Sequence, residues 1–515
     1  MRMNEFKQFL RNYRFQLIVA YMIVLVSFGF MLTNHTISID EETRLANTGT
    51  GLTWITQGRF GIVLLNLLFS PSGDYAPFLW DFLAVSLWFF SGVLSYYILF
   101  EQSGFLKNKS AALVIYCAYY ATVPLVAGEI LAFSMFNLQV AIAMNMTMLA
   151  FAFLLQWVLY SKRACLLWAI SLLTFAVSVY QAFLCVAATM TVAYLLLAFQ
   201  NGTVRPFKLL MKALPVFAAS ILLYSAITFL LSAFIQQGGY LADSYLGWRD
   251  ERAVFYALFA TVANVVRLSF GLTIRDLTIY GGLEIGFASC SLLAFSILRT
   301  IRTSTLKGKA ACLALTALLF AAPFSLYLIL GTHNTAGRML LGMPIVQGLG
   351  IVMLLEELKS KRVHLAALLL AGLLLFLNAR NMNTLFYYGS VAYRHDVATA
   401  HHILHDIQES GADYHQKPVI FIGKHEMDHV KMVSSGTIGQ SFFAWDDGNN
   451  GRIADFYNTL GYAFMRPNRA QCSQAAELTK SMNAWPASGS ILTTEEMIIV
   501  FLSPPTEQWY KVNAT

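Results

Sequence analysis

The chain has 515 residues, of which 57% are hydrophobic and only 12% are charged. A soluble protein of this length could not bury so large an apolar fraction, so the composition excludes an ordinary soluble fold. The formal net charge of +7 is divided among separate loops rather than gathered on one basic surface, which argues against a nucleic-acid partner.

Long apolar runs predict a polytopic α-helical membrane protein, because a helix satisfies its own backbone hydrogen bonds in lipid. Hydropathy indicates about eleven spans, with approximate cores at 15–33, 76–100, 111–127, 136–160, 164–179, 181–199, 213–234, 281–298, 311–330, 339–355 and 365–379. The stretch 164–199 is too long for one span and short for two, with Tyr180 and Gln181 at the possible break. The apolar run 60–70 is too short to span and predicts a re-entrant or interfacial helix.

Positive charge alternates from loop to loop along the chain. Lysines occupy the loops on one side, and the opposite loops before residue 365 contain none. The positive-inside rule therefore predicts a cytoplasmic N-terminus and an external tail. We expect a membrane domain over 1–394, with outer loops at 34–75 and 235–280.

Residues 395–515 are more polar than the rest and predict a small soluble α/β domain on the outer face. The apolar runs Pro418–Gly423 and Glu496–Ser503 are typical of strands. The segments Ala398–Gln408 and Gln471–Met482 are typical of helices.

Three adjacent carboxylates in the first outer loop, Asp40, Glu41 and Glu42, are the main catalytic candidates. One interpretation is a solvated loop or the acidic first turn of an interfacial helix. The other is a base that accepts the proton of an incoming hydroxyl group. Sugar transfer from a lipid phosphate by single displacement needs one such base, because phosphate leaves without a proton.

Arginines on the outer side are candidates for holding that phosphate. Arg44 and Arg59 follow the acidic cluster, and Arg338 ends a short outer loop just before a span re-enters the membrane. A guanidinium group can bind a phosphate through two parallel hydrogen bonds. The alternative is an arginine whose side chain only reaches the lipid headgroups.

Several aromatic and polar side chains are candidates for binding the sugar: Trp54, Tyr180, Gln181, His333, Phe443 and Trp445. Tyr180 and Gln181 interrupt an apolar stretch at mid-depth, where they would line a cavity. The Tyr180-Gln181 pair has an alternative role as a hydrogen-bonded link between helices, which we favour. The aromatic run 439–446 has an alternative role in a small core, which we also favour.

The segment 425–429 reads His-Glu-Met-Asp-His and matches the zinc-protease pattern. It directly follows a strand-like run, whereas this motif requires a helix that presents both histidines. Seven of the ten histidines lie between residues 395 and 429, which makes a chance match easier. We therefore predict no metal site and no cofactor, and leave a divalent cation open.

Taken in order, these features resemble the type II O-antigen glucosyltransferase family of bacteriophage serotype conversion. The resemblance rests on Ser38–Glu42, Trp54, Gly58-Arg59, Tyr180-Gln181, Gly337-Arg338, Arg394–Asp396 and Ser441–Trp445. It implies a GT-C-like fold with its active site on the outer face and Asp40 as the base. The third acid leaves the assignment within the cluster open.

The resemblance also implies the substrates and the location. The donor would be glucose on undecaprenyl phosphate, and the acceptor would be the O-antigen of lipopolysaccharide. The protein would lie in the bacterial inner membrane, with its C-terminal domain in the periplasm.

Two functions from different classes follow. The first is an inverting glycosyltransferase that uses a polyprenyl-phosphate sugar. The second is a transporter or a flippase for lipid-linked sugars, in which the same charges would line a path. The charges lie toward the outer surface rather than at mid-bilayer, and a soluble outer domain suits acceptor binding, so we favour the transferase.

Overall fold

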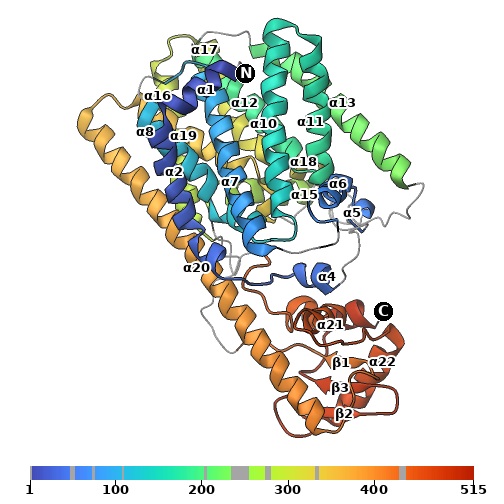
Figure 1. Ribbon diagram of the computed structural model, residues 1–515. Helices are drawn as coiled ribbons and strands as arrows, with labels where there is room; N and C mark the ends of the chain where they lie inside the picture. Colours follow the sequence, from blue (N-terminus) through green and yellow to red (C-terminus); the bar gives the residue numbers. More distant parts are fainter. Residues whose placement is uncertain are drawn as a thin grey trace. The chain divides into compact units, whose positions relative to one another are not determined.

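The computed structural model describes residues 3–46, 53–71, 73, 76–106, 109–201, 206–232, 254–272, 280–330, 336–427 and 436–514 (Figure 1). The chain divides into two compact units. Unit 1 comprises Met1–Leu32 and Thr50–Asn383, and unit 2 comprises Thr33–Gly49 and Thr384–Thr515.

Unit 1 is built from helices. They are α1 (Met3–Asn12), α2 (Arg14–Ser27), α3 (Gly29–Thr33), α5 (Thr53–Thr56), α6 (Phe60–Phe69), α7 (Pro77–Tyr96), η1 (Tyr97–Glu101), α8 (Lys109–Thr122), η2 (Pro124–Gly128), α9 (Glu129–Leu131), α10 (Asn137–Tyr160), α11 (Arg163–Val179), α12 (Phe183–Asn201), α13 (Pro206–Ser232), α15 (Val254–Phe270), α16 (Gly282–Arg302), α17 (Leu306–Ala321), η4 (Ala322–Phe324), α18 (Ser325–Leu330), η5 (Gly337–Met339) and α19 (Met343–Glu357). The long helix α20 (Lys361–Glu409) begins in unit 1 and ends in unit 2.

Within the described residues, seven helices are long and apolar enough to cross a membrane, or nine if two bent pairs each count as one span. The prediction of about eleven spans is therefore not confirmed. The predicted spans 164–179 and 339–355 do form helices, α11 and α19, but these have only 17 and 15 residues. About 20 residues are needed to cross the hydrocarbon core.

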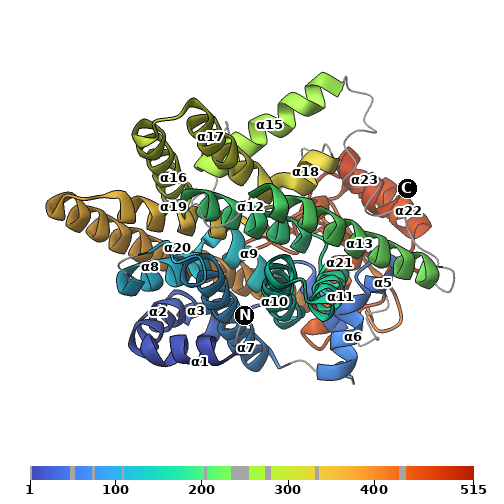
Figure 2. The same cartoon turned by 90° about the horizontal axis from the view of Figure 1, so that it is seen from above.

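Buried polar pairs link some neighbouring helices of unit 1. Helix α10 packs between α7 and α11, and α16 packs against α19 (Figure 2). Asn137 on α10 donates to Asp81 on α7 over 2.6 Å, and Gln139 donates to Asn66 on α6 over the same distance. In an apolar environment such bonds hold neighbouring helices in register.

The predicted break near residue 180 and the predicted short helix at 60–70 are both present. The stretch 164–199 breaks between Val179 and Phe183, where α11 ends and α12 begins. The run 60–70 forms the ten-residue helix α6. Of the predicted outer loop 235–280, the structure describes 254–272, which carries the helix α15, and residue 280.

Unit 2 contains a three-stranded sheet in the order β1-β3-β2. Strand β1 (Val419–Ile422) is parallel to β3 (Ile498–Phe501), and β2 (Ile491–Thr493) is antiparallel to β3. Both predicted strands are confirmed as β1 and β3. The helices of this unit are α4 (Glu41–Ala46), η6 (Trp445–Asp447), α21 (Asn450–Thr459), α22 (Arg469–Leu478), η7 (Thr479–Ser481) and α23 (Glu507–Asn513), together with the end of α20.

Each face of this sheet has its own core, because successive strand residues point to opposite sides. Val419 and Phe421 face a core made with α20 and α21. Ile420 and Ile422 face a second core made with α22 and Trp509 of α23. Unit 2 is thus a small three-layer α/β unit.

The segment 33–49 belongs to unit 2, whereas the sequence predicts it as part of the membrane domain. Ile37 and Ile39 are buried in the core that α20 and α21 form with the sheet. These two side chains fix the chain immediately before Asp40 and thereby position the acidic cluster.

Candidate functional site

Glu41 closes the turn that begins α4. Its backbone N–H donates to the carbonyl oxygen of Ser38 over 3.1 Å, and its Oε2 accepts from the Ser38 N–H over 2.8 Å. The side chain has no exposed surface. This is half of a capping box, in which a carboxylate three residues along satisfies a free N–H group. Glu41 therefore shapes the backbone of the cluster.

Asp40 is the accessible acid of the cluster. Its side chain is 42% exposed, and its Oδ1 lies 2.6 Å from Nη2 of Arg452. Its backbone φ is 86°, in the left-handed region. Aspartate and asparagine tolerate this region better than most residues, and such conformations are concentrated at functional sites.

Glu42 is buried, and among the described residues only one of its two carboxylate oxygens has a hydrogen-bond partner. Its Oε1 lies 2.6 Å from Nη1 of Arg452, and its side chain has no exposed surface. Its Oε2 is also buried and has no hydrogen-bond partner within the described ranges. Burial raises the pKa of Glu42 to about 7, against the opposing effect of the Arg452 guanidinium. Glu42 is therefore poised to change charge near neutral pH.

Arg452 forms ion pairs with the carboxylates of Asp40 and Glu42. It lies in the first turn of α21, where its N–H donates to the side chain of Asn449, the N-cap residue. Its guanidinium reaches Asp40 and Glu42 through separate nitrogens, and its Nε lies 3.5 Å from Asp446. Sequence reasoning missed Arg452, because it follows Asp40 by 412 positions and no local pattern marks it.

In unit 1, Arg59 is held between two aromatic rings. Its Cζ lies 5.4 Å from the ring centre of Trp54 and 5.1 Å from that of Tyr180. Its Nε is buried without a hydrogen-bond partner in the part of the chain that is described. A guanidinium stacked in this way keeps its donors for an anionic ligand. The structure thus brings together three of the predicted site residues.

A glycine turn positions Arg59. Gly58 has φ 72°, and a Cβ there would lie 2.4 Å from the Tyr224 hydroxyl. That hydroxyl donates to the Gly58 carbonyl, and Gln181 donates to Tyr224 and to the carbonyl of Gln57. Gln181, in the break between α11 and α12, is therefore hydrogen-bonded to this turn and to α13, as expected for a hydrogen-bonded link between helices.

Arg338 lies in η5, at a point where two backbones come close. A Cβ at Gly337 would lie 2.3 Å from the Leu125 carbonyl oxygen. The Arg338 N–H donates to Glu129, which is buried, and its guanidinium lies over the ring of Phe133. These contacts fix the backbone of Arg338. His333 lies outside the described residues.

The other predicted site residues, Arg44, Phe443 and Trp445, all lie in unit 2. Arg44 is half-buried on α4 and belongs to unit 2, whereas Arg59 and Arg338 belong to unit 1. Phe443 is fully buried and packs on Phe421, as expected for a core residue and not for a sugar platform. Trp445 is half-buried and packs against the same core.

The zinc-protease pattern is not helical where the structure describes it. Residues 424–427 have irregular backbone, and Asp428 and His429 lie outside the described residues. The His425 ring lies 6.2 Å from that of His395 and edge-on to Trp485. No group of three metal-ligating side chains occurs among the described residues.

Comparison with known proteins identifies the family. The family model described as glucosyl transferase GtrII matches residues 29–355. The match includes the acidic cluster, Arg59 and Arg338, and it ends before Arg452. Neither a curated protein nor a solved structure shows a significant match. Because the match covers more than half of the chain and agrees with the resemblance seen in the sequence, this protein belongs to the glucosyl transferase GtrII family.

Proposed function

We propose that the protein transfers glucose from undecaprenyl-phosphate-glucose to the O-antigen of lipopolysaccharide, on the periplasmic face of the bacterial inner membrane. Family membership supports glucosyl transfer. The observation that carries the mechanism is the partly exposed carboxylate of Asp40 beside the buried Glu42 and Arg452. Membership of a glucosyltransferase family also favours this function over a transporter or flippase.

In the proposed reaction Asp40 removes the proton of an acceptor hydroxyl. The oxygen attacks the anomeric carbon, and the bond from that carbon to the phosphate oxygen breaks. The phosphate leaves with the bonding electrons and needs no proton, so one base suffices. Attack opposite the leaving group inverts the configuration. Of the three carboxylates, Asp40 is the proposed base, because Glu41 and Glu42 have no exposed surface.

Arg59 is the proposed donor-phosphate ligand, with Arg338 as a second. Arg59→Lys keeps the charge but loses the planar fork and weakens the stacking on Trp54 and Tyr180. We expect the KM for the lipid-linked donor to rise roughly tenfold, because charge-assisted bonds to a phosphate each contribute about 1.5–3 kcal/mol. Steady-state transfer by purified protein at varied donor concentration measures this.

The exposed arginine of α11 provides the control, since Arg163→Lys should leave KM unchanged. A purely structural Arg59 would give a different result: lower thermal stability with an unchanged KM for the donor.

Topology is tested with a cysteine introduced into unit 2. Cys472 is 2% exposed and therefore a poor label site, whereas the Lys480 side chain is 72% exposed. A Lys480→Cys variant without the six native cysteines should react with a membrane-impermeant maleimide in intact spheroplasts. Reaction only after lysis would place the tail in the cytoplasm and contradict the proposed face.

A further inference from the structure

The Arg59 side chain is held by rings and not by polar bonds. Its guanidinium lies between Trp54 and Tyr180 and forms no salt bridge with any residue that the structure describes. The buried Nε likewise has no hydrogen-bond partner in that part of the chain. The position of the guanidinium therefore depends on the backbone that carries it and on the two rings.

That backbone forms a closed turn at the end of α5. The N–H of Gly58 donates to the carbonyl of Ile55 over 2.9 Å, and the N–H of Arg59 donates to the carbonyl of Trp54 over 2.8 Å. The second bond ties Arg59 to the residue on whose ring it stacks. A shift of the turn would move both of them away from Tyr180, because Tyr180 belongs to a distant segment of the chain.

Tyr224 on α13 contacts both neighbours of Arg59. Its hydroxyl donates to the carbonyl of Gly58 over 3.1 Å. Its ring is stacked on the ring of Phe60, with the ring centres 6.1 Å apart. Helix α13 therefore holds the chain immediately before and immediately after Arg59.

Gln181 ties the same turn to the segment that supplies Tyr180. Its Nε2 donates to the carbonyl of Gln57 over 3.1 Å and to the Tyr224 hydroxyl over 3.0 Å. Tyr180 and Gln181 are consecutive, so the short break between α11 and α12 provides both a ring for Arg59 and a hydrogen bond for its turn. These contacts keep Arg59 aligned with both of its rings.

We propose that Tyr224 and Gln181 are positioning residues for donor binding, which hold Arg59 in place and thereby increase the affinity for the phosphate of the lipid-linked sugar. This role rests on the proposed function of Arg59 as a donor-phosphate ligand. A cation that is already fixed loses little conformational freedom when it binds, so more of the interaction appears as affinity. Neither positioning side chain has to contact the donor.

Tyr224→Phe removes the hydroxyl group and keeps the ring that packs on Phe60. With purified full-length protein and varied undecaprenyl-phosphate-glucose, KM for the donor should rise roughly three- to tenfold, the usual effect of losing one hydrogen bond. The value of kcat should stay within about twofold of wild type, because the lost contact affects binding and not the chemical step. A loss confined to kcat or to thermal stability would overturn the proposal.

Tyr96→Phe is the matched control for this variant. The Tyr96 hydroxyl also donates to a backbone carbonyl, that of Lys109, over 3.1 Å. It belongs to unit 1 but makes no contact with the Arg59 turn. Tyr96→Phe should therefore leave the donor KM unchanged, and a rise equal to that of Tyr224→Phe would contradict a specific role for Tyr224.

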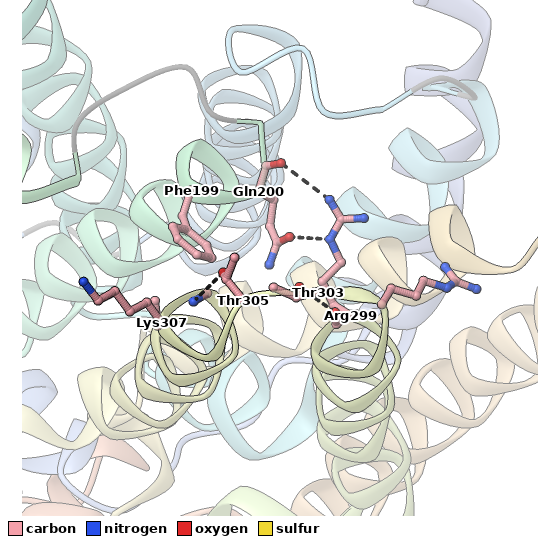
Figure 3. A pocket seen from close by; sticks show the side chains of 9 residues that line it. Phe199, Gln200, Arg299, Thr303, Thr305 and Lys307 are labelled. Atoms are coloured by element: carbon pink, nitrogen blue, oxygen red, sulfur yellow. Dashed lines mark hydrogen bonds between the residues drawn. The ribbon is translucent and has the colours of Figure 1, made fainter.

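Gln181→Leu removes two of the contacts and should raise the donor KM at least as much as Tyr224→Phe does. Its control is Gln200→Leu, because Gln200 also links helices of unit 1: its Oε1 accepts from Nε of Arg299 over 2.5 Å (Figure 3). Gln200→Leu should lower the thermal midpoint and leave the donor KM within about twofold of wild type. Equal rises in KM for the two glutamine variants would mean that any lost contact between helices weakens donor binding.

An Arg59→Lys background shows whether Tyr224 acts through Arg59. The planar fork is absent there, so adding Tyr224→Phe should raise KM by less than about twofold. The same rise in both backgrounds would mean that Tyr224 affects the donor without Arg59. Arg59→Lys with a wild-type KM would instead remove Arg59 from donor binding, whereas a raised KM in Arg59→Lys and a wild-type KM in Tyr224→Phe would contradict only the positioning role.

Discussion

Asp40→Asn should lower kcat for sugar transfer by roughly two to four orders of magnitude, the usual effect of losing a general base. Asparagine keeps the size and polarity of the side chain and tolerates the backbone φ of 86°. The substitution therefore removes the proton acceptor with little backbone strain. Transfer is measured with purified protein and lipid-linked donor, alongside the amount of protein in the membrane fraction.

Asp446→Asn is the matched control for that experiment. Asp446 also contacts Arg452, has a φ of 53° and is 37% exposed, close to the 42% of Asp40. If Asp40 is the base, Asp446→Asn should retain activity within a few-fold of wild type. Equal losses in both variants would show that the acids only balance the charge of Arg452. An active Asp40→Asn enzyme would remove Asp40 from the mechanism.

Apolar helices were the most predictable part of this fold. A long apolar run in a membrane has few alternatives to a helix, so each predicted span coincides with helical structure. The number of full spans was less predictable, because α11 and α19 have only 17 and 15 residues and a hydropathy pattern does not fix where a helix ends. Strand β2 was missed because three residues carry no measurable alternation.

The acidic cluster was predictable only where its residues are neighbours in the sequence. Asp40 and Glu42 stand out as adjacent acids, and the spacing of Ser38 and Glu41 is the local signal for a capping turn. Arg452 could not be found in this way, because its contact with Glu42 joins positions 410 apart. The burial of Phe443 is likewise decided by tertiary packing and not by the aromatic run around it.

Arg452 connects a part of the chain that matches the family model with a part that lies outside the match. The acids that it binds lie within the family match, whereas Arg452 lies beyond residue 355. In this protein, a residue beyond the family match therefore provides the counter-charge for the acidic cluster.

Arg452→Met should destabilise unit 2 by roughly 1–1.5 kcal/mol at pH 8, because Glu42 would then have to stay protonated one unit above its wild-type pKa of about 7, and one unit corresponds to about 1.4 kcal/mol. Glu42 would lose its Nη1 donor, and its Oε2 already has no partner among the described residues. The measurement is the resistance of the segment 384–515 to proteolysis, together with the thermal midpoint of the purified protein. Arg469→Met is the control, because this exposed arginine also follows an asparagine N-cap in the first turn of its helix.

The destabilisation should depend on pH in a definite direction. Burial raises the pKa of Glu42 to about 7, and loss of Arg452 raises this pKa further, because the guanidinium lowers it in the wild type. An acid with a raised folded-state pKa contributes stability at low pH and loses it as pH rises through that pKa. The Arg452→Met protein should therefore approach wild-type stability at pH 5, where Glu42 is neutral, and Glu42→Gln in the same background should restore stability at pH 8. A loss of stability equal at pH 5 and pH 8, and unchanged by Glu42→Gln, would mean that Arg452 acts by packing and not by compensating the charge of Glu42.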